Sequence, residues 1–131
     1  MLDEFIIAIQ TRLTGDAGLT AVVPASRIGN HIKDDATFPH IDWRLEGVVD
    51  GEDKTAESYQ GNLIIEVFSE YRGDLECYQI QALIRSALAT RLTVTGADNF
   101  LLRFGSIEVS TEGDNRTRQA TITYPFMIGE S

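Results

Sequence analysis

The chain has 131 residues, of which 43% are hydrophobic and 24% charged, a composition typical of globular proteins rather than disordered or fibrous ones. The length predicts one domain over residues 1–131, built around a single core. The formal net charge is −9, and the nine arginines are scattered along the chain. We therefore expect no surface that grips nucleic acid or an anionic membrane, because both need clustered Lys and Arg.

Cysteine content and hydropathy exclude further classes of protein. The single cysteine, Cys77, excludes an internal disulfide framework and a cysteine-based zinc site. No apolar run reaches the roughly 20 residues that a membrane helix needs. The chain begins Met-Leu-Asp-Glu, which lacks the basic start of a signal peptide. We expect a soluble domain that is made in the cytoplasm.

The N-terminal part of the chain predicts two helical segments. Over residues 2–13, apolar side chains recur at helical spacing, and acidic residues stand at the positive N-terminal end. Asp16 is a suitable N-cap for a second, short helical turn over residues 19–23, which Pro24 ends. A weak strand is expected over residues 27–32.

The next strand is predicted over residues 39–45, with Pro39 at its first position. Alternation places Ile41, Trp43 and Leu45 on one face and the polar set His40, Asp42 and Arg44 on the other. The acidic segment 46–57 follows, and its composition predicts a solvated hairpin loop that is flexible in the free subunit.

The central part of the chain gives the clearest pattern. Residues 62–69 alternate apolar and mixed positions and predict a strand. Asp74 is a suitable N-cap for a helix that runs to about Leu92, with an apolar stripe through Cys77, Ile80 and Ile84.

Two strands are expected at the C-terminal end. The first, over residues 100–110, changes its apolar phase near Gly105, which predicts a bulge or bend. A turn over residues 112–115 leads to the second strand, residues 117–128. Because Pro125 lacks a backbone N–H, this second strand is expected at the sheet edge or to be bulged there. The element order predicts an α+β fold, a two-layer sandwich of a mostly antiparallel sheet with two main helices on one face.

The chemistry-bearing residues form no convincing catalytic or metal-binding set. The candidate metal ligands are His31, Asp34, Asp35, His40 and Asp42, but the two histidines lack ligand spacing, and His40 and Asp42 share a polar strand face expected to meet solvent. Cys77 lies on an apolar helix stripe, which indicates a buried structural thiol. No nucleophile elbow, phosphate-binding glycine loop or EF-hand spacing is present in the sequence. We expect no catalytic residue, no cofactor and no metal ligand, and no enzymatic activity.

Several segments resemble, in order, the tail terminator or tail completion proteins of long-tailed bacteriophages and gene-transfer particles. The resemblance follows the N-terminal helix, residues 16–23, Arg27-Ile28, residues 38–41, the acidic loop, residues 63–73 and the helix 75–92. It implies a structural virion protein of the tail or neck, a homo-hexameric ring that caps the tail tube, stops its polymerisation and joins the head connector. DNA would pass through the ring without specific binding, and an acidic ring suits this because it repels phosphate.

If the resemblance holds, the two loops are candidate docking sites for the tail-tube protein and the head-side connector or stopper. The residues concerned are Val48, Val49, Asp50, Glu52, Asp53 and Lys54 in the first loop, and Glu112, Asp114, Asn115 and Arg116 in the second. One alternative is another neck-ring protein, the head-tail stopper. A second is a small-molecule-binding or enzymatic α+β domain, for which the sequence offers only the His40, Asp42 and Arg44 face.

Overall fold

A computed structural model describes residues 1–30, 37–51, 56–70, 74–111 and 116–130 of the chain. Three α-helices and a mixed sheet of six strands make up this part, which confirms the predicted α+β class. The elements are α1 (Leu2–Gly15), α2 (Ala17–Thr20), the 3-10 turn η1 (Ala25–Arg27), β1 (Ile28–Gly29), β2 (His40–Asp50), β3 (Ser58–Ser69), α3 (Leu75–Ala87), β4 (Asn99–Leu102), β5 (Ser106–Thr111) and β6 (Arg118–Gly129). No helix within these ranges is long and apolar enough to span a membrane.

Both predicted N-terminal helical segments form, although α2 spans Ala17–Thr20 rather than residues 19–23. Phe5, Ile9 and Leu13 lie one above the other on α1 and are fully buried. Asp16 separates α1 from α2, and its side chain accepts a hydrogen bond of 2.9 Å from the backbone N–H of Leu19. This N-cap satisfies one of the free donors at the start of α2, so the chain can turn sharply after Gly15.

The strand order is β1-β2-β3-β6, and both β4 and β5 pair with the far side of β6. β1 is parallel to β2, whereas the other four pairings are antiparallel. Since β6 is paired on both sides, the predicted edge position for the last strand is wrong. Pro125 is tolerated because the strand beside it is interrupted there: β4 ends opposite Phe126 and β5 begins opposite Thr123.

The prediction of one bent strand over residues 100–110 is also wrong, because this segment forms two separate strands, β4 and β5. Gly105 lies between them, and its N–H donates to the carbonyl of Thr123 at 2.8 Å. A Cβ at this position would be 2.8 Å from that carbonyl oxygen and 2.9 Å from the Pro125 ring. Only glycine allows the chain to pass this close to β6.

The predicted loop over residues 46–57 begins too early, since residues 46–50 continue β2 and β3 starts at Ser58. Residues 52–55 of the loop lie outside the described part of the chain. The register of β2 shifts between Glu46 and Val49, where Gly47 adopts a φ of +64°. Gly61 lies opposite, with Val48 Cα 3.1 Å from the place of a Cβ. A glycine bulge thus lets an acidic, low-hydrophobicity segment remain in the sheet.

α3 ends at Ala87, five residues before the predicted end at Leu92. The guanidinium of Arg12 on α1 donates to the carbonyls of Ala87 at 3.0 Å and Thr90 at 2.7 Å, and so satisfies acceptors that the end of the helix leaves free. Leu92 and Val94 are nevertheless buried, so the apolar pattern continues after the helix has stopped. Asp74 stands at the predicted N-cap position, but its side chain makes no capping hydrogen bond.

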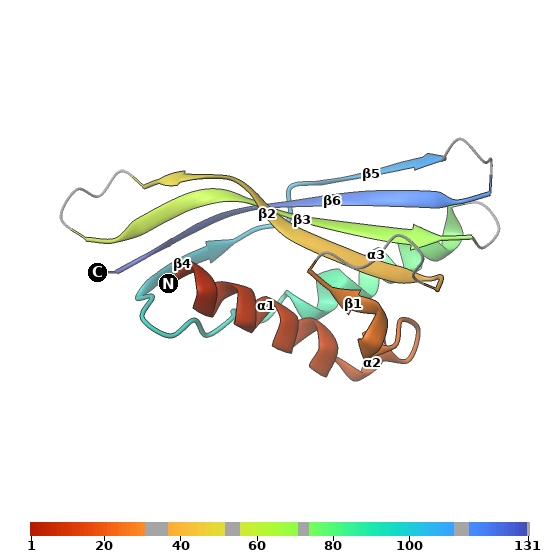
Figure 1. The fold of residues 1–131 in the computed structure, drawn as a ribbon, viewed down its shortest axis with the longest axis horizontal. Helices are drawn as coiled ribbons and strands as arrows, with labels where there is room; N and C mark the ends of the chain where they lie inside the picture. The colour runs from red at the N-terminus through yellow and green to blue at the C-terminus, as the bar shows by residue number, and fades with distance from the viewer. Residues whose placement is uncertain (31–36, 52–55, 71–73, 112–115, 131) are drawn as a thin grey trace.

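The helices lie on one side of the sheet, as Figure 1 shows for α1, α2 and α3. Their buried side chains join one core cluster with alternating residues of β2, β3 and β6. The sheet's contribution to that cluster is Ile41, Trp43, Leu63, Ile65, Val67, Ala120, Ile122, Tyr124, Phe126 and Ile128. The indole N–H of Trp43 donates to Gln10 Oε1 at 2.8 Å, which joins β2 to α1. The opposite face of the sheet carries no helix among the described residues.

Candidate functional site: two hairpin ends and an open sheet face

The two predicted docking segments lie at opposite ends of the sheet. Ser58 pairs with Gly129 at the end where the β2–β3 hairpin turns, and Ser69 pairs with Arg118 at the end where the β5–β6 hairpin turns. Figure 1 shows these hairpins pointing away from each other, with both chain termini near the first. The structure therefore does not bring the two segments into one site; it places one at each end of the molecule.

At the β2–β3 end, the three described candidate residues belong to the strand rather than to a loop. Val48 is half-buried and packs against the core, whereas Val49 is 54% exposed and Asp50 is also exposed. The remaining candidates, Glu52, Asp53 and Lys54, lie outside the described residues.

Further acidic groups surround the β2–β3 end. The hydroxyl of Tyr59 donates to Glu57 Oε2 at 2.7 Å, and this hydrogen bond to a carboxylate raises the pKa of Tyr59 above its ordinary value. Glu130 follows β6 at the same end, where its N–H donates to the carbonyl of Glu57. The described residues thus give this end a predominantly negative charge.

The β5–β6 end carries charges of both signs. Arg116 is exposed, and its guanidinium lies 3.9 Å from Glu70. Arg118 Nε lies 3.5 Å from Asp74 Oδ1, at the start of α3. The other three candidates of this segment, Glu112, Asp114 and Asn115, lie outside the described residues. The more exposed of these pairs, Arg116 with Glu70, contributes little to stability.

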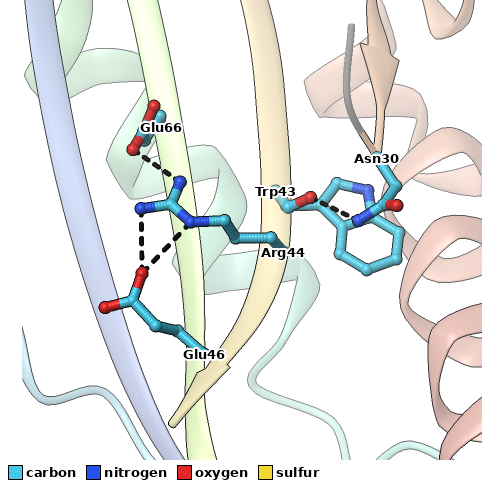
Figure 2. Close-up of polar contacts among 5 residues, drawn as sticks. All are labelled: Asn30, Trp43, Arg44, Glu46 and Glu66. Atoms are coloured by element: carbon cyan, nitrogen blue, oxygen red, sulfur yellow. Dashed lines mark hydrogen bonds and ion pairs between the residues drawn. The ribbon is translucent and has the colours of Figure 1, made fainter.

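The open face of the sheet holds a short ion-pair network, drawn in Figure 2. The guanidinium of Arg44 donates to Glu66 at 2.6 Å and reaches Glu46 at 3.1 Å. These carboxylates raise the pKa of Arg44 further above its ordinary value. Beside the network, the Asn30 side chain donates to the carbonyl of Trp43 at 2.7 Å and satisfies one acceptor on the outer edge of β2.

The polar strand face formed by His40, Asp42 and Arg44 is not the solvated surface expected from the alternation. His40 is buried and stacks on Phe68 with ring centroids 4.7 Å apart, and burial lowers the pKa of its imidazole. Arg44 is paired with its carboxylates, and the hollows along α1 and along β4 and β6 are lined by other residues. Of the residues considered for metal binding, His31, Asp34 and Asp35 lie outside the described ranges. Within those ranges, no group of three or more metal-ligating side chains occurs.

A row on the open face with three exposed apolar side chains and one glutamine was missed by the sequence analysis. Val49 pairs with Gln60, Gln60 with Met127, and Met127 with Leu101, so this row crosses four strands. Leu101 and Met127 are about as exposed as Val49, at 49% and 54%. The alternation along β6 could have indicated Met127, but the row requires the glycine bulge of β2 and the separate strand β4. Apolar side chains gathered on an exposed face are typical of a protein contact surface.

Cys77 is fully buried on α3, as its place on the apolar stripe predicts. Burial raises the pKa of the thiol to about 11, so the thiolate form needed for nucleophilic chemistry is disfavoured.

Comparison with known proteins gives the class of this chain: a structural component of a virion tail. The sequence matches the family of the tail completion protein gp17 over residues 7–129, and the chain belongs to this family. As a family member it is located in the tail or neck of the virion, in association with other virion proteins. This confirms the resemblance noted in the sequence.

The fold is also that of a chain in a solved structure, "Virion of native gene transfer agent (GTA) particle". The two chains superpose with a TM-score of 0.81 and 18% sequence identity, over 94% of this chain and 92% of the other. At this identity the likeness shows a shared fold. No curated protein sequence matches the chain.

Proposed function

We propose that this tail completion protein is the tail terminator, a single domain that forms a hexameric ring on the end of the tail tube. In this role it stops the tube from growing and joins it to the head-side connector. The observation that carries the proposal is the placement of the two candidate docking hairpins at opposite ends of one sheet. A ring of such subunits, with strands running between its two surfaces, presents one hairpin type to the tube and the other to the head.

The fold supports this role through its layers. Helices packed on one face of a sheet give a two-layer sandwich whose core needs no contribution from a partner. The hairpins extend beyond this core, so that they can adapt to other proteins without disturbing it. We propose that the protein acts without catalysis, because Cys77 and His40 are both used in packing.

Net charge supports the passage of DNA through the ring. Each subunit has a formal charge of −9. A ring of several copies therefore repels phosphate, and DNA can slide through the centre without being held by counterion release. The head-tail stopper remains the second candidate, since a neck ring also needs two docking ends. The two differ in which partner is captured: the tail-tube protein for a terminator, and the portal-side adaptor for a stopper.

Two sets of substitutions test the proposal, one at each end of the sheet. The first set is Asp50→Asn, Glu52→Gln and Asp53→Asn; the second is Glu112→Gln, Asp114→Asn and Arg116→Ser. Each set serves as the control for the other, because both change only side chains near a hairpin. In virions assembled with these variants, electron microscopy should show overlong tails with one set and normal tails detached from heads with the other. Wild-type particles from both sets would contradict the docking role.

A further inference from the structure

We propose that neighbouring copies of this chain join head-to-tail, with the β2 and α1 edge of one copy against the β5 and α3 edge of the next. This inference rests on the proposed ring and adds which surfaces build it. Each of the two edges combines an open strand with exposed apolar side chains on a helix, which are Ile6 and Ile7 on α1 and Tyr78 on α3. In this contact the sheets of the two copies would join edge to edge, and their helical layers would lie side by side.

The first edge is formed by β2 and α1. β1 covers β2 only at Ile41 and Asp42, and Asn30 caps the carbonyl of Trp43. From residue 44 to residue 50, no described strand pairs with the outer side of β2. Such a row of unpaired backbone groups is a template for another strand.

Beneath that strand edge, α1 exposes an apolar stripe. Gln10 bonds Trp43, which fixes this side of α1 along β2. Ile6 is 37% exposed and Ile7 is 58% exposed, and both line a hollow shared with Gln10 and Trp43. Asp3 lies one turn earlier on α1, and its carboxylate is paired with the N-terminal ammonium at 2.9 Å.

The second edge is formed by β5 and α3. Over its six residues β5 pairs with β6 alone among the described strands. It has no proline, lysine or bulge to protect it, and Ile107 and Val109 are only partly buried. An added strand would complete the cover over these two side chains.

α3, which packs on β3 and β6, carries the exposed side chain of the second edge. Arg85 lies 4.1 Å over the ring of Phe104, just before β5, which fixes this side of α3 toward the β5 edge. Tyr78 lies two turns earlier on the same side and is 47% exposed. An exposed aromatic ring thus lies on this side of α3, whereas α1 exposes two aliphatic side chains, Ile6 and Ile7.

The directions of the strands favour this pairing. β2 and β5 are antiparallel within one subunit, because three successive antiparallel pairings separate them. Rotation about an axis roughly along the strands keeps each direction, so β5 of one copy meets β2 of the next in antiparallel orientation. The two open stretches are displaced along the strands, and tilted strands in a closed ring accommodate such a displacement. Because the two edges differ, the contact is heterologous and can close into a ring.

Single substitutions on each helix test the assignment. Ile7→Glu and Tyr78→Glu both replace exposed side chains, so the fold is retained. Each should weaken self-association about tenfold or more, since it places an unpaired charge in the contact. Val22→Glu is the matched control, because Val22 is 41% exposed after α2 and belongs to none of the four elements that form the two edges. Sedimentation velocity measures the oligomers, and circular dichroism checks folding.

Mixing the two edge variants gives the decisive result. The Ile7→Glu chain keeps an intact β5 and α3 edge, and the Tyr78→Glu chain keeps an intact β2 and α1 edge. We expect a heterodimer from the mixture that does not grow further. A contact in which one edge pairs with itself would give no new complex on mixing and would overturn the inference.

A disulfide experiment tests the same contact in assembled tails. The double variant Ile7→Cys, Tyr78→Cys should give an oxidised ladder of oligomers, whereas each single variant should not. Rings that form without this ladder and resist both glutamate substitutions would refute the edge assignment and leave the terminator role intact. Absence of any oligomer, in solution and in tails, would refute the proposed ring itself.

Discussion

The two faces of the sheet consist of the same strands but differ in burial and composition. On the helix-covered face, alternating residues of β2, β3 and β6 are buried against α1 and α3. On the open face, the same strands present the Arg44 network, Thr121 and Thr123, and two side chains of the exposed row, Val49 and Met127, to which β4 adds Leu101. The difference indicates that one face supplies the stability of the fold, and the other is available for contacts with other proteins.

Two side chains on the open face are nevertheless buried. Ile64 is only 7% exposed and lies beside Arg44, its partner across β2 and β3. His40 is 6% exposed and is stacked between Phe38 and Phe68. Long and planar side chains thus cover parts of the sheet that no helix covers, so small contributions to stability are expected from this face as well.

A pair of substitutions on neighbouring ladder positions should show the largest difference between the faces. Ile65 is fully buried on the helix-covered face, and Ile65→Ala should lower the free energy of unfolding by about 2–5 kcal/mol. Thr121 pairs with Glu66 on the open face, and Thr121→Ala should change stability by about 0.5 kcal/mol or less. Urea unfolding measures both variants. Equal losses would mean that the open face contributes to the core.

The ion-pair network should give an intermediate effect. Glu66 Oε1 accepts from Arg44 at 2.6 Å, and its side chain is only 16% exposed. Glu66→Gln should therefore lower stability by about 1 kcal/mol, and the loss should shrink as salt screens the pair. Glu108→Gln, an exposed position on the same face, is the control and should be near neutral. A loss for Glu108→Gln as large as that for Glu66→Gln would show that general charge, rather than the network, sets the effect.

Local patterns were sufficient for most of the helix-covered face. The spacing of Phe5, Ile9 and Leu13 predicts α1, and Asp16 predicts the cap that precedes α2, because both signals are contained within a few residues. The same holds for the alternation of β3. The family resemblance was also recoverable, since it depends on the order of such segments along the chain.

The errors fall where distant residues decide the structure. Acidic composition suggested a loop at 46–50, but pairing with β3 and the Gly47–Gly61 contact keep this segment in the sheet. Pro125 suggested an edge strand, but the gap between β4 and β5 removes the need for its N–H. The end of α3 depends on Arg12, which is 75 residues away in the sequence from Ala87. None of these partners is visible in the local pattern of the segment concerned.

Low pH should lower the stability of the folded chain through His40 on the open face. This is the smallest of the expected effects. Burial holds the pKa of His40 below its ordinary value of 6.5, although Asp42 and a backbone hydrogen bond with Thr37 act in the opposite direction. As the pH falls below about 6.5, the unfolded chain therefore binds a proton that the folded chain resists, and stability decreases until the pH reaches the lower folded-state pKa. His40→Phe retains a ring that can stack on Phe68 and removes the titrating group.

Urea unfolding of both chains at pH 7.5, 6.5 and 5.5 checks this expectation. Other titrating groups, His31 included, are present in both chains and cancel in the difference. The variant should therefore gain stability relative to the wild type as the pH falls through this range, because only the wild type must keep a neutral imidazole at position 40. A difference that stays constant with pH would mean that His40 binds its proton equally well in the folded and unfolded chains. This result would contradict the expected effect of its burial.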